Sequence, residues 1–109
     1  MSSSSRSSGN LTADGIVVTG QCKLVSIHGI NLHATDMTVI VVYDNTAASG
    51  KVVAKMAIPG LTSAGSDQSG ATVNPTATSM EYDMHGVLCR NGLYIDVTNG
   101  TPHVTIEYA

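Results

Sequence analysis

Two Asn-Gly pairs in the C-terminal quarter constrain the fold of this chain more than any other feature. Asn91-Gly92 and Asn99-Gly100 each separate two short runs rich in aliphatic and β-branched residues. Asn-Gly between such runs is the strongest short-range signal for a β-hairpin, because a type I′ turn needs positive φ at both central residues. We therefore expect strands at 84–90, 93–98 and 103–108 that form a C-terminal three-stranded meander.

The last two of these runs show the alternation of a half-buried strand. Every second residue is Leu, Ile or Val in 93–98, and Val, Ile or Tyr in 103–108. A period of two places these side chains on one face of a sheet. We expect this face to form the core together with an earlier strand. The residues expected in this core are Leu93, Ile95, Val97, Val104, Ile106 and either Val39 or Val41.

Four further runs with strand character precede the C-terminal quarter, at 15–20, 22–32, 36–44 and 51–58. Run 36–44 is apolar on both faces, which predicts a central strand covered on both sides. The alternation in 22–32 breaks at His28-Gly29, where we expect a bulge or bend. Seven to eight short strands without helical periodicity predict an all-β fold, an antiparallel β-sandwich of jelly-roll-like type.

Two long polar segments interrupt this pattern. Residues 1–13 are rich in Ser and are expected to form a flexible N-terminal arm, because a segment with so few apolar groups cannot offset its ordering entropy by burial. Residues 14–109 are expected to form a single sandwich domain with a long loop at 59–79, and loops of this length usually carry function. We expect both segments to contact a partner protein, through Ser3, Ser4, Arg6, Leu11, Leu61, Asp67, Gln68 and Val73.

Composition limits the classes of partner. Only 12% of the residues are charged, the net charge is −3, and the five Lys and Arg residues do not cluster, so nucleic acid is not an expected partner. No run approaches the roughly 20 apolar residues of a membrane span. Residues 1–10 lack the apolar stretch of a signal peptide, so we expect synthesis in a cytoplasm. The core has no Phe or Trp to fill it, and a thin aliphatic core favours stabilisation by oligomerisation.

The sequence contains no persuasive catalytic or metal-binding motif. Glu81 and Asp83 fall on one face of a strand, as a glycosidase pair does, but two exposed acids on a strand are far commoner. No Gly-x-Ser-x-Gly elbow, phosphate-binding loop or metal-ligand spacing is present, so we predict no enzyme, no cofactor and no metal. The four histidines are expected to be structural or surface residues: His28, His33, His85 and His103.

The two cysteines leave two alternatives open. Cys22 and Cys89 lie far apart in the sequence and in no Cys-x-x-Cys motif. They are either two reduced thiols buried as small hydrophobic groups, which is the commoner case, or a single bridge between two strands.

Several stretches of the chain resemble a known group of proteins. The residues concerned are 42–51, VYDNTAASGK, and, after the long loop, Gly86-Val87, 91–97, NGLYIDV, and 104–108, VTIEY. This arrangement resembles small virion structural proteins of tailed bacteriophages, cyanophages among them. The resemblance implies a jelly roll or similar sandwich without catalytic residues, located in the virion at the capsid, neck or tail.

From this resemblance and the composition we expect a non-enzymatic capsid decoration or cement protein that binds and stabilises the head shell. Its partners would be the major capsid protein or another virion protein, and further copies of itself, with a homotrimer favoured. The alternative is a tail or receptor-binding carbohydrate-binding module, in which Tyr82, Tyr94 and nearby acids contact a sugar. The absence of Trp weakens this alternative, because such sites favour its large flat ring.

Overall fold

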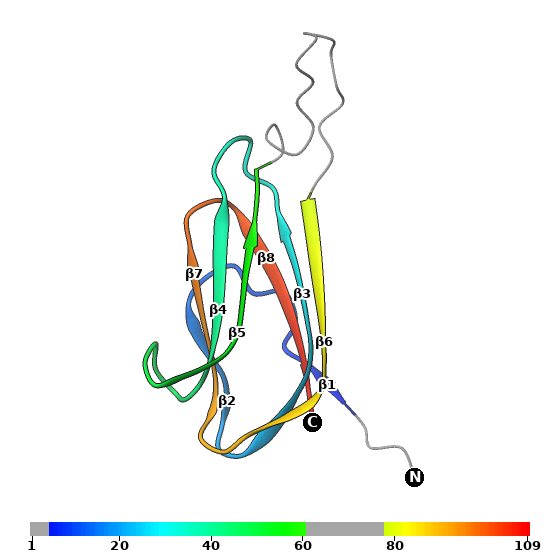
Figure 1. Ribbon diagram of the computed structural model, residues 1–109, viewed down its shortest axis with the longest axis vertical. Coiled ribbons are helices and arrows are strands. Elements are labelled where there is room, and N and C mark those ends of the chain that lie inside the picture. Colours follow the sequence, from blue (N-terminus) through cyan, green and yellow to red (C-terminus); the bar gives the residue numbers. More distant parts are fainter. Residues whose placement is uncertain (1–4, 61–77) are drawn as a thin grey trace, which may run out of the picture.

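The structure, a computed structural model, describes residues 5–60 and 78–109, which form eight β-strands in two four-stranded antiparallel sheets (Figure 1). No helix occurs in these two ranges. Sheet A has the order β1 (Arg6–Ser7), β8 (Pro102–Tyr108), β3 (Cys22–Asn31), β6 (Thr78–Cys89). Sheet B has the order β2 (Gly15–Thr19), β7 (Gly92–Thr98), β4 (Thr38–Asp44), β5 (Lys51–Ile58). The prediction of an all-β fold with seven to eight antiparallel strands is confirmed for these residues.

The two sheets enclose one aliphatic core, as in a β-sandwich. Val42 lies opposite Ile95 and Ile40 opposite Val97 on the neighbouring strand, so these side chains share the inner face of sheet B. The prediction that Val39 or Val41 joins the core is therefore wrong, because the register turns these two residues outwards. Among the described residues, nine aliphatic side chains are fully buried: Leu24, Ile27, Ile40, Val42, Ile58, Leu93, Ile95, Val104 and Ile106.

The predicted C-terminal meander is wrong. β6 and β8 both lie in sheet A, separated by β3, whereas β7 lies in sheet B. Asn99-Gly100 has the expected backbone, with φ of 59° and 69°, whereas at Asn91-Gly92 only the glycine has positive φ, at 140°. Such residues fix a local reversal of the chain. They do not decide whether the next strand pairs with its predecessor or crosses to the other sheet, and burial of both apolar faces favours the crossing here.

β3 contains a bulge, but not where the sequence predicts it. The register with both neighbouring strands shifts between Leu24 and Ser26, ahead of the expected break at His28-Gly29. Gly29 continues the ladder and is buried on the inner face. A Cβ atom at Gly29 would lie 2.9 Å from Ile58 Cδ1 of the opposite sheet, so glycine permits the close approach of the two sheets here.

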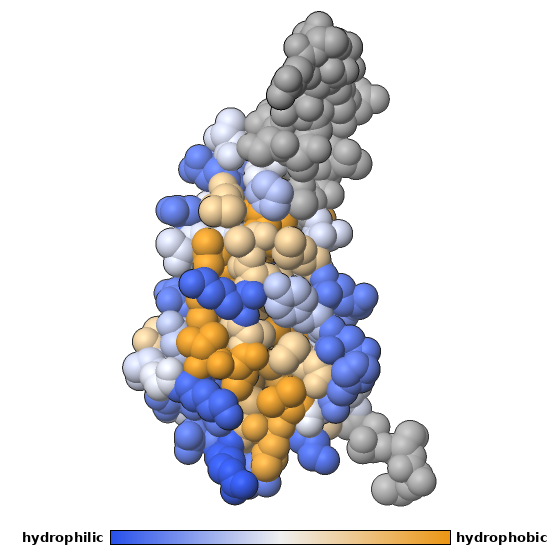
Figure 2. Space-filling view, viewed as in Figure 1, coloured by the Kyte–Doolittle hydropathy of each residue, from blue (hydrophilic) through white to orange (hydrophobic). Residues whose placement is uncertain are grey.

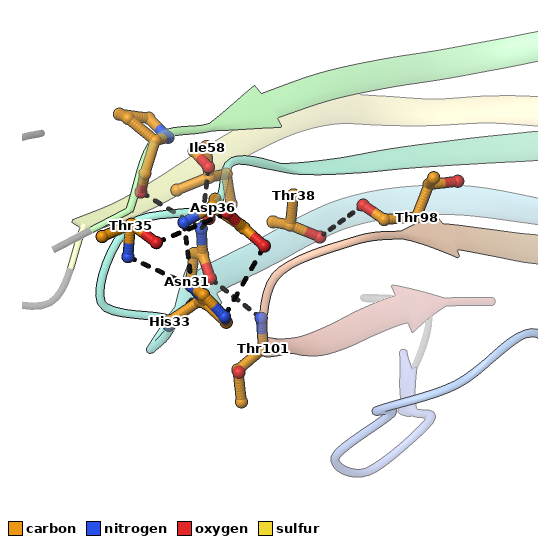
Figure 3. A network of polar contacts seen from close by, with 9 residues as sticks. Asn31, His33, Thr35, Asp36, Thr38, Ile58, Thr98 and Thr101 are labelled. Atoms are coloured by element: carbon orange, nitrogen blue, oxygen red, sulfur yellow. Dashed lines mark hydrogen bonds and ion pairs between the residues drawn. The ribbon is translucent and has the colours of Figure 1, made fainter.

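The side chain of Asn31 joins four segments at one end of the sandwich (Figure 3). Its Nδ2 donates to the carbonyl oxygens of Asp36 at 2.8 Å and Ile58 at 2.9 Å. Its Oδ1 accepts the backbone N–H of His33 at 3.0 Å and of Thr101 at 3.1 Å. Asn31 is fully buried, and these bonds satisfy its polar atoms. The loop after β3, the end of β5 and the turn before β8 are thereby held together.

The described part of the N-terminal segment is built into sheet A. β1 extends the sheet beside β8, and an isolated bridge follows at Leu11. The backbone N–H of Ser8 donates to the Ile106 carbonyl at 2.8 Å, and that of Leu11 donates to the Val104 carbonyl at 2.7 Å. Through these bonds, the described residues of the expected arm are joined to β8 of their own chain.

Candidate functional site

The structure places only two of the eight predicted partner-contact residues. Arg6 is exposed in β1, whereas Leu11 is half-buried and packs against the core, so its apolar surface is already used within the chain. The predicted loop at 59–79 falls largely on residues 61–77, outside the described residues. The remaining predicted contacts also lie outside them: Ser3, Ser4, Leu61, Asp67, Gln68 and Val73.

A continuous row of apolar and aromatic side chains crosses the outer face of sheet B. Ile16 of β2 lies opposite Tyr94 of β7, Tyr94 lies opposite Tyr43 of β4, and Tyr43 lies opposite Val52 of β5. Residues directly opposite on neighbouring antiparallel strands project from the same face, so the four side chains are neighbours. We call Ile16, Tyr94, Tyr43 and Val52 the outer row. Its two ends are open to solvent, with Ile16 55% and Val52 47% exposed.

The outer row continues into a mixed surface along β4. Val41 lies between Asp96 of β7 and Lys55 of β5, and both Val39 and Val41 are only half-buried. Within residues 5–60 and 78–109, no element covers this face. The prediction that β4 is covered on both sides is therefore met for its inner face only. Figure 2 shows a different part of the surface, in which apolar residues gather along the middle of the view, between β5 of sheet B and β6 of sheet A, with hydrophilic residues on both flanks.

Two carboxylates lie beside the outer row. The pKa of Asp96 is raised by its partial burial and by the neighbouring carboxylate of Asp14. Asp14 is itself held in place because its Oδ1 accepts the backbone N–H of Val97 at 2.7 Å. Two negative charges this close repel each other, and protonation of the Asp96 carboxyl relieves that repulsion. The two carboxyl groups lie next to Tyr94, in the aromatic part of the row.

The outer face of sheet A carries a hollow of about 600 Å³ whose walls are partly polar and partly apolar. His28 Nδ1 lies 3.0 Å from Glu81 Oε2, which links β3 to β6. At the other side Asn10 Nδ2 lies 3.0 Å from His103 Nδ1. The hollow therefore separates two hydrogen-bonded pairs. Its lining consists of Asn10, His28, Gly29, Ile30, Ser79, Met80, Glu81, His103 and Thr105.

Next to this hollow, three residues follow the contact order of a serine hydrolase triad. Ser26 Oγ lies 3.3 Å from His28 Nε2, and His28 Nδ1 contacts Glu81. However, the Ser26 hydroxyl donates its single proton to Glu107 Oε1 at 2.9 Å, and Ser26 is only 7% exposed. A nucleophilic serine must donate that proton to the histidine and must reach its substrate. This group therefore links β8, β3 and β6 through its side chains.

Glu107 anchors this polar network. Hydrogen bonds from Ser5 at 2.6 Å and from Ser26 hold the pKa of Glu107 below its usual value. The bond from Ser5 also fastens the start of the described chain to β8. Sequence reasoning missed this group because its members are 81 and 102 residues apart in the chain, and only the register of sheet A brings them together.

The two tyrosines of the carbohydrate hypothesis do not come together. Tyr82 lies in β6 of sheet A, packs against the core, and donates its hydroxyl to the Lys55 carbonyl at 3.1 Å. Tyr94 lies on the outer face of sheet B beside Tyr43 instead. The structure thus pairs Tyr94 with a different aromatic residue from the one that the sequence suggested.

Within residues 5–60 and 78–109, no group of three or more His, Cys, Asp or Glu side chains is placed to hold a metal ion. The same residues include no helix long and apolar enough to cross a membrane. Comparison with models of known families, with curated proteins and with solved structures found no match to this chain.

Proposed function

We propose that this chain is a non-enzymatic structural protein of a tailed-phage virion that attaches to the head shell through the outer face of sheet B. The observation that carries the proposal is the outer row, an apolar strip across all four strands with both ends exposed. An exposed, contiguous apolar strip on a small domain marks a contact surface for another protein. The sequence pattern of β4, apolar on both faces, requires a cover on each side, and the described chain supplies only one.

We also propose that the fold is a jelly roll. The strand order β1-β8-β3-β6 facing β2-β7-β4-β5 supports this, because β1 pairs with β8, β2 with β7, β3 with β6 and β4 with β5. Such nested pairs arise when one long antiparallel ribbon is rolled up across two sheets. Jelly rolls with this double-sheet arrangement are common among viral capsid and lectin domains. The fold is thus compatible with the proposed role without specifying it.

The chemistry of the outer row suits a permanent contact with a shell. Tyr43 and Tyr94 offer flat apolar rings with a hydroxyl that can hydrogen-bond at the rim, and such residues are enriched in interfaces. Asp96 and Lys55 flank Val41 with opposite charges, so the face carries little net charge. Attachment should therefore depend little on salt, since few charges are available for screening.

Binding to heads that lack this protein tests the proposal. Purified chain is mixed with such heads, prepared from the virus that encodes it, and the bound fraction is measured by co-sedimentation. We expect Val52→Asp to fold and to lose at least tenfold in affinity, because it places a charge in the outer row. Leu88→Asp is the matched control, since Leu88 is 39% exposed but lies in sheet A. Equal binding by the two variants, or no binding by the folded wild type, would contradict the proposal.

The oligomeric state belongs to the same proposal. We propose a homotrimer, because a core without Phe or Trp leaves a chain of this size little burial of its own. Size-exclusion chromatography with light scattering reads the mass directly. A stable monomer at the concentrations that saturate the heads would contradict the trimer while leaving attachment through sheet B intact.

A second candidate is carbohydrate binding by the same face, and the pairing of Tyr43 with Tyr94 favours it. Two adjacent tyrosine rings can stack on a sugar, and Asp96 on the next row can accept bonds from its hydroxyl groups. A glycan array distinguishes the two functions. Binding to a defined glycan that Tyr94→Ala abolishes, together with failure to bind heads, would replace shell attachment by receptor recognition.

A further inference from the structure

Cys22 and Cys89 are directly opposite each other in sheet A. Cys22 is the first residue of β3 and Cys89 the last residue of β6, and the two are partners in the antiparallel ladder. Residues directly opposite in such a ladder have Cα atoms roughly 4.5–5.5 Å apart, within the range of about 4.4–6.8 Å that a disulfide spans. The sequence left the two cysteines as either separate thiols or a bridge, and the register supplies the proximity that a bridge requires.

Both side chains point to the inner face of the sandwich. Cys89 is fully buried and Cys22 is 7% exposed, and both belong to the core cluster. Side chains directly opposite on one face of a sheet are in contact range. Their electrostatic surroundings agree with this proximity. Asp44 raises the pKa of both thiols, and Cys22 also raises the pKa of Cys89. Both cysteines are free thiols in this structure.

One of the two thiols can be reached from solvent. A pocket of about 310 Å³ opens on Cys22, and its walls come from the start of β3, the end of β6 and the C-terminus. Cys89 does not line it. The pocket-lining residues are Gln21, Cys22, Lys23, Leu88 and Ala109. A small oxidant can therefore meet Cys22 first, with Cys89 positioned behind it.

We propose that Cys22 and Cys89 form an oxidation site, at which a low-molecular-weight disulfide of the glutathione class converts the two thiols into a bridge between β3 and β6. The proposal is independent of the attachment surface on sheet B. The Cys22 thiolate attacks one sulfur of the small disulfide, whose S–S bond breaks and releases one thiolate. The Cys89 thiolate then attacks the Cys22 sulfur of the mixed disulfide and releases the second. The two released thiolates take up the two protons, so the protein is oxidised and the small disulfide reduced.

The reaction should be slow at neutral pH and faster in alkali. Burial raises the pKa of Cys22, with a further contribution from Asp44. Burial, Cys22 and Asp44 raise the pKa of Cys89 to about 11, although the Lys51 ammonium opposes this. Because only the thiolate attacks, the rate should rise with pH throughout the range from roughly pH 7 to pH 9.

The bridge would close a ring that contains most of the chain. It would join residues 22 and 89 and so enclose β4, β5 and the ladder between β3 and β6. A cross-link over so long a segment removes much of the conformational freedom of the unfolded chain. We therefore expect oxidation to raise the thermal midpoint of unfolding by roughly 10 °C or more.

The test uses the full-length protein with oxidised glutathione as the probe. Intact mass and peptide mapping follow the thiols over time under native conditions. We expect the wild type to lose both thiol hydrogens without gaining glutathione, and to give a Cys22–Cys89 peptide. Cys89→Ser should instead retain glutathione on Cys22, whereas Cys22→Ser should remain unmodified at Cys89. Cys89→Ala and Cys22→Ala replace these variants if serine prevents folding.

Three outcomes would overturn the proposal. The first is a native wild type that keeps both thiols while the same protein in urea forms the bridge. The second is glutathione on both cysteines with no bridge, and the third is a bridge between chains rather than within one. Separately, an intrachain bridge with the same thermal midpoint in oxidised and reduced samples would contradict the expected stabilisation by the bridge.

Discussion

The carboxylate of Asp44 in sheet B accepts the backbone N–H of Asn91 at 2.8 Å and thereby holds the turn that leads from β6 to β7. It also accepts the backbone N–H of Arg90 at 3.2 Å. The turn crosses from one sheet to the other, so its amide groups have no ladder partner. A buried carboxylate that accepts several backbone N–H bonds satisfies these groups and fixes the crossing.

The stability of the protein should therefore fall in acid through Asp44. Its bonds with Asn91, Arg90 and Gly92, with help from Lys51, hold its pKa below the ordinary value of 3.8, although burial opposes them. A carboxyl whose pKa is lower in the folded state stabilises the fold above the unfolded-state pKa, and this contribution is lost as pH falls through the folded-state pKa. Urea unfolding between about pH 2 and pH 6 should show this loss below about pH 4.

The variant Asp44→Asn isolates this effect. We expect it to lose about 1–3 kcal/mol of unfolding free energy near neutral pH, and to differ least from the wild type at the acid end of the series. Asp36→Asn serves as the control, because Asp36 is an exposed aspartate in a loop. An equal acid dependence in Asp44→Asn and the wild type would show that the turn does not use this carboxylate.

Glycine at position 92 is required by both space and backbone conformation. φ is 140° there, and a Cβ atom would lie 2.5 Å from the Val18 carbonyl oxygen. Gly92→Ala should therefore lower the free energy of unfolding by about 3 kcal/mol or more. Gly15→Ala is the matched control in the paired strand, since no atom lies within 4 Å of its added Cβ. In chemical denaturation, Gly92→Ala should unfold at a clearly lower denaturant concentration than Gly15→Ala. Similar midpoints for the two variants would contradict the described turn.

The two faces of β4 can be compared with a pair of identical substitutions. Val42 is fully buried, whereas Val41 is half-buried on the outer face. Val42→Ala should cost about 2 kcal/mol, from the lost transfer of two methyl groups and the cavity left behind. Val41→Ala should cost less than about 1 kcal/mol in the isolated chain. The reverse order in urea unfolding would mean that the opposite face of β4 is buried.

The buried amide of Asn31 should not tolerate an isosteric acid. Asn31→Asp replaces a donor facing the carbonyls of Asp36 and Ile58 by an oxygen, so both lose their partner and face a negative charge. We expect a loss of about 3 kcal/mol or more. Asn99→Asp is the control, because Asn99 is exposed and aspartate also tolerates its positive φ of 59°. Equal thermal midpoints for Asn31→Asp and Asn99→Asp would contradict the hydrogen-bond network of Asn31.

Much of the secondary structure could be predicted from local chemistry. The strand expected at 51–58 is β5 (Lys51–Ile58), and the run expected at 93–98 differs from β7 by one residue. Positive φ at Gly92 was also correctly predicted. These features depend on alternation and on turn residues, which act over a few neighbouring positions.

The candidate site could be predicted far less well. The outer row depends on three strand registers that align Ile16, Tyr94, Tyr43 and Val52, and no local pattern determines those registers. The one available signal was the apolar character of both faces of β4, which predicted a cover on each side, whereas the described chain covers only the inner face.

The amino-acid sequence by itself determined most of the strands, their polarity pattern and the positions of the turns, because these follow from side-chain periodicity and backbone preference. It did not predict β1 (Arg6–Ser7) or the first half of β6 (Thr78–Cys89). Only the tertiary structure decided which strands pair. It separated the three C-terminal strands between two sheets, brought Cys22 beside Cys89, and aligned the outer row. The physical reason is that partner choice depends on burying two apolar faces at once, a property of the whole assembly of strands and of no single segment.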